Sequence, residues 1–167
     1  MTQQWSFLSG LRGLRRLGPR GVLSALSTAA WACAVEAALR TGRTPQIARR
    51  LGVPLDQATP AGAPSAPLAL TPAEKRSLRT VRRVLSHRPF NGTCLRQALL
   101  VGHALRARRP VLRIGVRKAD GELLAHAWVE IDGYAIDRYT VIPADRSDFL
   151  ILQPVARHGS AAWKDLR

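Results

Sequence analysis

The sequence predicts an α+β fold in which a helical N-terminal part precedes a helix that packs on an antiparallel sheet. Three observations support this prediction. They are a helix-start signature at Thr71, an Asp132-Gly133 turn between two predicted strands, and a change in apolar spacing after Ala107 from about 3.6 residues to 2. The chain has 167 residues, of which 46% are hydrophobic. This is enough for one compact core and short for two, so we expect one domain.

The N-terminal segment, residues 1–54, is predicted to be helical. Residues 27–40 contain an apolar stripe at helical spacing that consists of Trp31, Val35, Ala38 and Leu39. Cys33 lies among alanines in the same stretch, so we expect it to pack in the core. A second short helix should follow and end near Gly52.

An apolar run over residues 22–39 follows several arginines and imitates a signal peptide or a short membrane span. Glu36 interrupts the run, serine and threonine dilute it, and further arginines follow it. We therefore expect an amphipathic or buried helix rather than a secretory signal, and we expect no membrane association.

A Pro- and Ala-rich connector over residues 55–70 separates the N-terminal segment from a core over residues 71–167. The core begins with Thr71-Pro72-Ala73-Glu74, a capping-box signature that predicts a helix start. Pro89 should stop this helix, and its buried stripe should contain Leu78, Val81 and Leu85. The opposite face carries the cations Lys75, Arg76, Arg79, Arg82 and Arg83. This face is either a solvated surface or a docking site for an anionic partner.

A second core helix should run from Cys94 to about Ala107, where the helical spacing ends. Three strands are predicted after it, over residues 111–118, 122–131 and 134–137, with a further strand over residues 149–155. The Asp-Gly pair between the second and third strands favours a two-residue hairpin.

Cys94 stands at the start of its helix, where a thiol could be a small apolar residue, a metal ligand, half of a disulfide or a nucleophile. Cys33 is the only other cysteine, and the spacing gives neither a disulfide framework nor a zinc motif. We therefore expect a reducing, cytoplasmic environment, no metal and no cofactor. The formal net charge of +15 suits an anionic partner, but aromatic residues make up only 5% of the chain. Since no nucleic-acid recognition motif occurs either, we expect no nucleic-acid partner.

His126 and Asp137 are the residues that could act with a nucleophilic thiol. In the predicted hairpin Trp128 faces Asp137, and alternation of side chains puts His126 on the same face, diagonal to Asp137. A carboxylate there orients an imidazole and stabilises its cation, while a helix start favours thiolate over thiol. Each residue alone has a structural explanation, but together they predict a Cys94, His126 and Asp137 triad that forms an acyl-enzyme. Glu130 shares the predicted face and is the alternative acid.

The other histidines are poorer partners for the thiol. His103 follows Cys94 by nine positions and points to the opposite side of the predicted helix. His87 and His158 lie in predicted loops without a paired acid.

The segment from Thr93 to Asp137 resembles the stand-alone leader peptidase of lasso-peptide biosynthesis, a papain-like and transglutaminase-like cysteine protease family. The most specific pieces are CLRQALL, RIGVRK and AHAWVEIDG. Residues 27–51 and the helix from Thr71 are similar to the less distinctive N-terminal part of that family.

The resemblance implies a transglutaminase-like fold and removal of the leader from a ribosomally made lasso precursor peptide, with Cys94, His126 and Asp137 as catalytic residues. It also implies an ATP-dependent lasso cyclase and a separate recognition-element protein, because the N-terminal segment lacks the strands of a fused element. One departure is Arg96, which stands where the family commonly has proline. Two alternatives stay open. One is a transglutaminase-like acyltransferase that uses the same triad, and the other is a basic binding module without catalytic activity.

Overall fold

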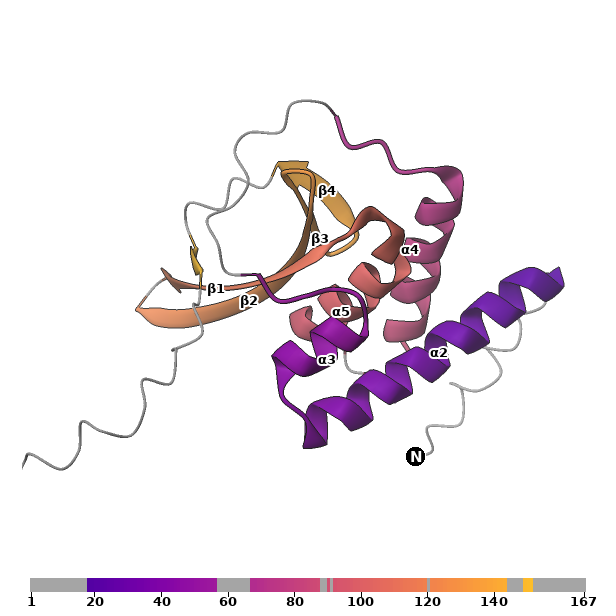
Figure 1. Cartoon of the computed structure of the whole chain (residues 1–167), viewed down its shortest axis with the longest axis horizontal. Coiled ribbons are helices and arrows are strands. Elements are labelled where there is room, and N and C mark those ends of the chain that lie inside the picture. Colours follow the sequence, from indigo (N-terminus) through magenta and orange to yellow (C-terminus); the bar gives the residue numbers. More distant parts are fainter. Residues whose placement is uncertain are drawn as a thin grey trace, which may run out of the picture.

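A computed structural model describes residues 18–56, 67–87, 90, 92–119, 121–143 and 149–151. Within these residues, helix α5 lies against an antiparallel sheet, and helices α2 and α4 pack on α5 (Figure 1). The helical N-terminal part thus precedes a helix packed on an antiparallel sheet. The predicted α+β fold class is confirmed.

The helices follow the predicted order with small changes in their bounds. They are α2 (Gly18–Thr41), α3 (Thr44–Arg50), α4 (Pro72–Leu85) and α5 (Cys94–Ala104). α5 ends earlier than its apolar spacing predicts, because the chain tightens into a 3-10 turn, Arg106–Arg108, and leaves it through Arg109 at a φ of 52°. The predicted stop at Pro89 lies outside the described residues, although α4 does end shortly before it.

Five strands form the described sheet in the order β4-β3-β2-β1-β5. Their bounds are β1 (Val111–Ala119), β2 (Glu122–Ile131), β3 (Tyr134–Asp137), β4 (Thr140–Pro143) and β5 (Leu150–Ile151). The hairpin at Asp132-Gly133 has the predicted register, with Val129 opposite Ile136. β4 was not predicted, and of the strand expected over residues 149–155 the structure shows only β5, since residues 152–155 lie outside the described part.

The start of α4 has the predicted capping box. The Glu74 backbone N–H donates to Thr71 Oγ1 at 3.2 Å, and the Thr71 N–H donates to Glu74 Oε2 at 2.7 Å. The predicted buried stripe is also confirmed, because Leu78, Val81 and Leu85 are all buried. Glu74 additionally accepts two hydrogen bonds from Arg108, at 2.7 and 3.0 Å. This pair fixes the beginning of α4 to the 3-10 turn that follows α5.

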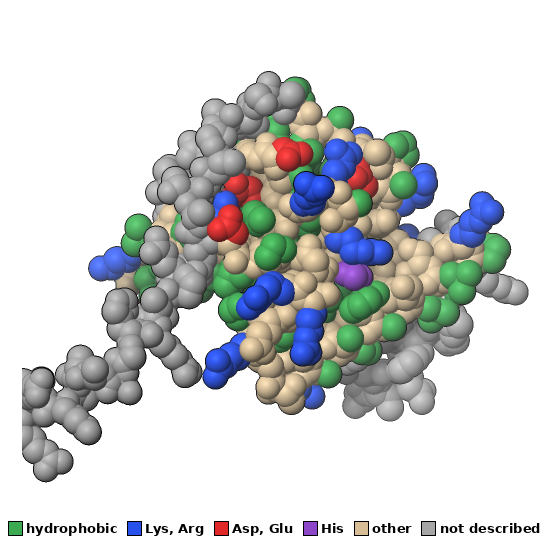
Figure 2. Space-filling view, viewed as in Figure 1, with side chains coloured by type: hydrophobic (Ala, Val, Ile, Leu, Met, Phe, Trp, Pro, Cys, Tyr) green, Lys and Arg blue, Asp and Glu red, His purple; other side chains and the backbone are tan. Residues whose placement is uncertain are grey.

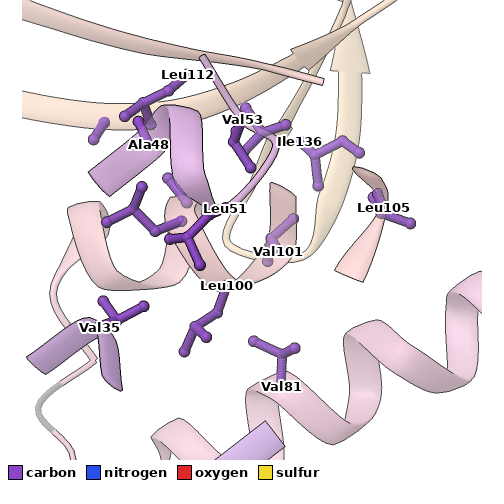
Figure 3. Packing of buried hydrophobic residues seen from close by; sticks show 14 of the residues in the cluster. Val35, Ala48, Leu51, Val53, Val81, Leu100, Val101, Leu105, Leu112 and Ile136 are labelled. Atoms are coloured by element: carbon purple, nitrogen blue, oxygen red, sulfur yellow. The ribbon is translucent and has the colours of Figure 1, made fainter. Parts of the chain in front are cut away.

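One apolar cluster joins the helices to the inner face of the sheet (Figure 3). Buried side chains from α2, α3, α4, α5, β1, β2 and β3 all contribute to it, and Figure 3 labels some members of the cluster. The fit is tight where Val53 meets α5, because a Cβ at Gly102 would lie 2.5 Å from Val53 Cγ1. Only a glycine allows the chain to approach α5 this closely.

α2 differs most from expectation. Only Ala32 and Val35 are buried, so the prediction of an amphipathic or buried helix is wrong, and Cys33 is exposed rather than packed in the core. Trp31 is 40% exposed and tilts against His103, with ring centroids 4.2 Å apart. The reason is that α2 meets the core along one narrow line, in which Ala32 and Val35 are buried and Ala38 and Leu39 are only partly buried. By length and composition alone, α2 could also cross a membrane.

Glu36, the charge that interrupts the apolar run, has a structural partner. It accepts a hydrogen bond from Arg96 Nε at 2.6 Å and forms an ion pair with Arg40 at 3.2 Å. The hydrogen bond from Arg96 is the main reason that the pKa of Glu36 lies below its ordinary value. Arg96 therefore ties α2 to the beginning of α5, two residues from Cys94.

A short stretch after α3 extends the edge of β1. Leu55 forms a parallel bridge with Leu112, whose N–H donates to the Pro54 carbonyl at 2.9 Å. Arg113, next along β1, is 3% exposed and donates to Glu130 at 2.9 Å and to the Asp56 carbonyl at 3.0 Å. The buried guanidinium thereby joins the end of the N-terminal segment to the middle of the sheet.

Candidate active site

Cys94 is the first residue of α5 and is half-buried. Thr93 precedes it in an extended conformation, as an N-cap residue does, but its side chain does not cap the helix. Its hydroxyl accepts instead from Arg96 Nη1 at 3.3 Å. The first N–H groups of α5 therefore keep their capacity to donate, and an oxyanion beside the thiol is the kind of acceptor they suit.

His126 and Asp137 form the predicted pair. The imidazole Nε2 and Asp137 Oδ1 are 3.0 Å apart, and both side chains are about one-fifth exposed (18% and 19%). The pair forms because of the register of the hairpin, in which the residue numbers of paired positions on β2 and β3 add up to 265. This register puts His126 diagonal to Asp137, the last residue of β3. Since Nε2 faces the carboxylate, Nδ1 is the ring nitrogen that remains to exchange a proton with another group.

Cys94 and Asp137 line the same small pocket at the beginning of α5. Gln97, Ala98 and Val101 contribute the helix side of this pocket, and the sheet side is made of Ala127, Ile136, Arg138 and Tyr139. A wider pocket of about 400 Å³ opens outward from it and shares Cys94, Gln97, Arg138 and Tyr139. The thiol thus lies where a pocket meets solvent, and Asp137 is the member of the predicted triad that adjoins it.

His126 reaches the site from the other face of the sheet. Ala127, Val129 and Ile131 of β2 pack into the cluster that contains α5, so the alternating residues His126 and Trp128 belong to the opposite face. Among the described residues the Cys94 thiol makes no hydrogen bond, and His126 does not line either pocket that contains the thiol. The structure therefore brings His126 to Asp137 and Asp137 to Cys94, but it does not join the imidazole directly to the thiol.

Aromatic side chains and a glycine hold the imidazole in place. The His126 ring lies 6.1 Å from Trp128 and 5.9 Å from Phe149, measured between ring centroids. Gly115 is directly opposite His126 on β1, and a Cβ there would come within 3.0 Å of both Trp128 and Phe149. No role was predicted for Gly115, although glycine inside a strand often marks a close approach of this kind.

The remaining acid and histidines have other partners. Glu130, the alternative acid, is 3% exposed and forms a buried ion pair with Arg113, so its contact is structural. His103 Nδ1 lies 3.0 Å from the Leu51 carbonyl, and His87 Nδ1 lies 2.6 Å from the Arg83 carbonyl. His158 lies outside the described residues. No group of three or more His, Cys, Asp and Glu side chains within the described part is arranged to hold a metal ion.

Sequence reasoning missed three residues around the thiol. Arg82 of α4 lines the wider pocket together with Arg138 and Tyr139, the two residues of the turn between β3 and β4. Burial raises the pKa of the Tyr139 phenol, and the positive charge of Arg82 opposes that shift. Arg82 was visible in the sequence as one cation of a helix face, but its orientation toward the thiol depends on how α4 packs.

Comparison with known families agrees with this arrangement. A sequence profile of the transglutaminase-like superfamily matches residues 12–153, which include α2 through β5. No curated protein and no solved structure matches the chain. The superfamily generally includes cysteine proteases, and its fold is that of a papain-like cysteine protease or acyltransferase. From the match and from a helix-borne thiol beside a strand-borne His-Asp pair, we conclude that this chain belongs to the transglutaminase-like superfamily.

Proposed function

We propose that the protein is a cysteine peptidase that removes the leader from a ribosomally made lasso precursor peptide. The observation that carries the peptidase part is the pocket at the start of α5, where Cys94 lies beside Asp137 and Asp137 binds His126. The lasso precursor as substrate rests on the sequence resemblance around CLRQALL and AHAWVEIDG.

The proposed reaction begins when Cys94 Sγ attacks the carbonyl carbon of the scissile peptide bond. His126 takes the thiol proton at Nδ1 and passes a proton to the leaving amine, so the C–N bond breaks and a thioester forms. Water then attacks the thioester, gives a proton to His126 and releases the leader as a carboxylic acid. Asp137 holds the imidazole throughout and stabilises its cation. The structure does not join the imidazole to the thiol, so the proposed step requires that peptide binding brings the two groups together.

A groove between α2 and α4 supports the proposal of a separate recognition-element protein. Four arginines, Arg20, Arg76, Arg79 and Arg83, line this groove of about 570 Å³. Such a surface suits the acidic part of a leader or an acidic patch on the protein that holds it. Elsewhere the charge is distributed, since Figure 2 shows Lys and Arg side chains spread over the visible face. The ATP-dependent lasso cyclase would act on the released core in the cytoplasm.

The proposal is tested by supplying the predicted partners. The chromosomal neighbourhood should contain a short precursor gene, an asparagine-synthetase-like cyclase and a small recognition protein. Incubation of the full chain with that precursor and that recognition protein should give a free leader fragment detectable by mass spectrometry.

An acyltransferase would give a different product in the same incubation. Transfer of the acyl group to an added amine would yield a leader amide rather than a leader acid. A precursor that stays intact with the recognition protein present would contradict the peptidase proposal.

A further inference from the structure

Two arginines from separate elements meet at the mouth of the thiol pocket. Arg82 extends from α4 and Arg138 from the β3–β4 turn, and together with Gly92, Gln97 and Tyr139 they surround Cys94 in the wider pocket. No Asp or Glu is among the residues that line this pocket. Neither Arg82 nor Arg138 forms an ion pair with any residue in the described part. Among the described residues, the carboxylate that adjoins this pocket is Asp137, which lines the smaller pocket with Cys94 and Arg138 and pairs with His126. The described lining of the wider pocket therefore presents two cationic side chains beside the thiol and no anionic one.

The turn that carries Arg138 is chemically unusual. Two hairpins of the sheet, β2–β3 and β3–β4, have two-residue turns in which both turn residues are described. Asp132-Gly133 has φ angles of 48° and 76°, and Arg138-Tyr139 has φ angles of 46° and 73°. Asp-Gly suits left-handed backbone conformations, whereas Arg and Tyr adopt them at an energetic cost. Strain of this kind is typical of residues retained for what their side chains contact.

Arg82 also differs from the other cations on α4. Arg76, Arg79 and Arg83 line the groove against α2, whereas Arg82 lines the pocket that contains Cys94 and Tyr139. The two sets of arginines thus belong to separate surfaces. This separation provides a matched control, because Arg79 lies on the same helix but does not line the thiol pocket.

We propose that Arg82 and Arg138 form a carboxylate-binding subsite beside the Cys94 thiol, which takes an acidic side chain of the peptide close to the scissile bond. Guanidinium groups suit this ligand because their planar forks donate paired hydrogen bonds to carboxylate oxygens. The inference rests on the proposed peptidase function for its ligand, but the subsite itself can be measured without any substrate peptide.

The test compares alkylation of Cys94 by iodoacetate and by iodoacetamide. In both reactions the thiolate sulfur attacks the methylene carbon and iodide leaves, and the reagents differ mainly in that iodoacetate carries a carboxylate. Cys33 is exposed on α2 and serves as a second thiol in the same chain, which corrects for the overall charge of the protein. Mass spectrometry of proteolytic fragments gives both rates at both positions.

At low ionic strength the rate ratio of iodoacetate to iodoacetamide should be roughly tenfold higher at Cys94 than at Cys33. Changing both Arg82→Gln and Arg138→Gln should reduce that ratio to the level of Cys33, and Arg79→Gln should leave it unchanged. Equal ratios in the parent and the double variant would overturn the proposal.

Arg138→Asn separates binding from folding. Asparagine tolerates positive φ better than arginine, so this variant should be at least as stable as the parent while losing most of the preference for iodoacetate. If the double variant that combines Arg138→Asn with Arg82→Gln kept the full preference for iodoacetate at Cys94, this result would also contradict the proposed subsite.

A second arm uses the precursor from the chromosomal neighbourhood. Changing its acidic residues near the scissile bond to the corresponding amides should lower kcat/KM for the parent and have little effect on Arg138→Asn. Absence of cleavage by the parent would count against the peptidase proposal alone, since the alkylation ratios report the subsite independently.

Discussion

The two cysteines occupy contrasting regions of the molecule. Cys33 lies in the middle of α2, exposed on a helix that buries only Ala32 and Val35. Cys94 begins α5, is half-buried, and opens onto pockets lined by an acid, a phenol and two arginines. The same functional group is therefore either exposed on a helix or surrounded by charged and polar side chains. The contrast teaches that the neighbouring elements, rather than the thiol itself, decide the surroundings on which a nucleophilic role depends.

The largest expected effect is the loss of leader release when the Cys94 thiol is removed. Cys94→Ala should abolish leader release, because no other described thiol lies beside the His-Asp pair, while its far-UV circular dichroism should match that of the parent. Cys33→Ala is the matched control and should retain most activity. The measurement is leader release by mass spectrometry with the precursor and recognition protein, and comparable loss in the two variants would contradict the assignment.

The next largest expected effect concerns the His126-Asp137 pair, which adjoins the pocket of Cys94 and has no counterpart beside Cys33 among the described residues. His126→Ala should reduce leader release nearly as much as Cys94→Ala, because it removes the base. Asp137→Asn should reduce it less, since it disturbs the orientation and tautomer of the imidazole without removing it. Initial rates of leader release measure both. If Asp137→Asn had no effect, the hydrogen bond to His126 would be structural, and the burial of Glu130 with Arg113 makes that residue a poor substitute.

A smaller effect, on partner binding, is expected from the groove between α4 and α2, the helix that carries Cys33. Replacing Arg76, Arg79 and Arg83 with Gln should weaken partner binding severalfold at low ionic strength and have little effect near physiological salt, because exposed charges act mainly on association. Turnover of the bound complex should hardly change. Titration of the recognition protein at two salt concentrations tests this, and identical affinities at low salt would make the groove an ordinary solvated surface.

The smallest effect concerns stability rather than chemistry. The hydrogen bonds from Arg108, with those from Thr71, hold the pKa of Glu74 at about 2, below its ordinary value of 4.5. A lowered pKa stabilises the folded state above about pH 4.5, and this contribution is lost as the pH falls toward 2. Glu74→Gln should therefore cost about 1 kcal/mol in free energy of unfolding at pH 7, allowing for partial solvent exposure, and less at pH 3. Urea denaturation at both pH values checks the difference, and an equal cost at both would contradict the ion pair.

The sequence predicted those parts of the fold that depend on local patterns. The capping box at Thr71, the apolar stripe of α4 and the positions of strands β1 and β2 all depend on neighbouring residues. The His126-Asp137 contact was predictable for the same reason, because a two-residue turn fixes the register of its hairpin.

The remaining features depend on how elements pack together. The exposure of Cys33 follows from the few neighbours of α2, which no local pattern specifies. Helix α5 covers one face of β2, and this choice of face decides where His126 lies relative to Cys94. The periodicity of the sequence alone does not determine which face is covered. β4 was missed because Arg138-Tyr139 lacks the residues that usually mark such a turn.

The most direct test of the central claim is the intact mass of the enzyme after acid quenching during turnover. The protein should be mixed with the precursor and its recognition protein, quenched within the first turnover, and digested to locate any adduct. We predict a transient species heavier than the enzyme by the mass of the leader minus one water, attached at Cys94 as a thioester. Leader release that continues in Cys94→Ala, or an adduct located at Cys33, would contradict the claim that Cys94 is the nucleophile.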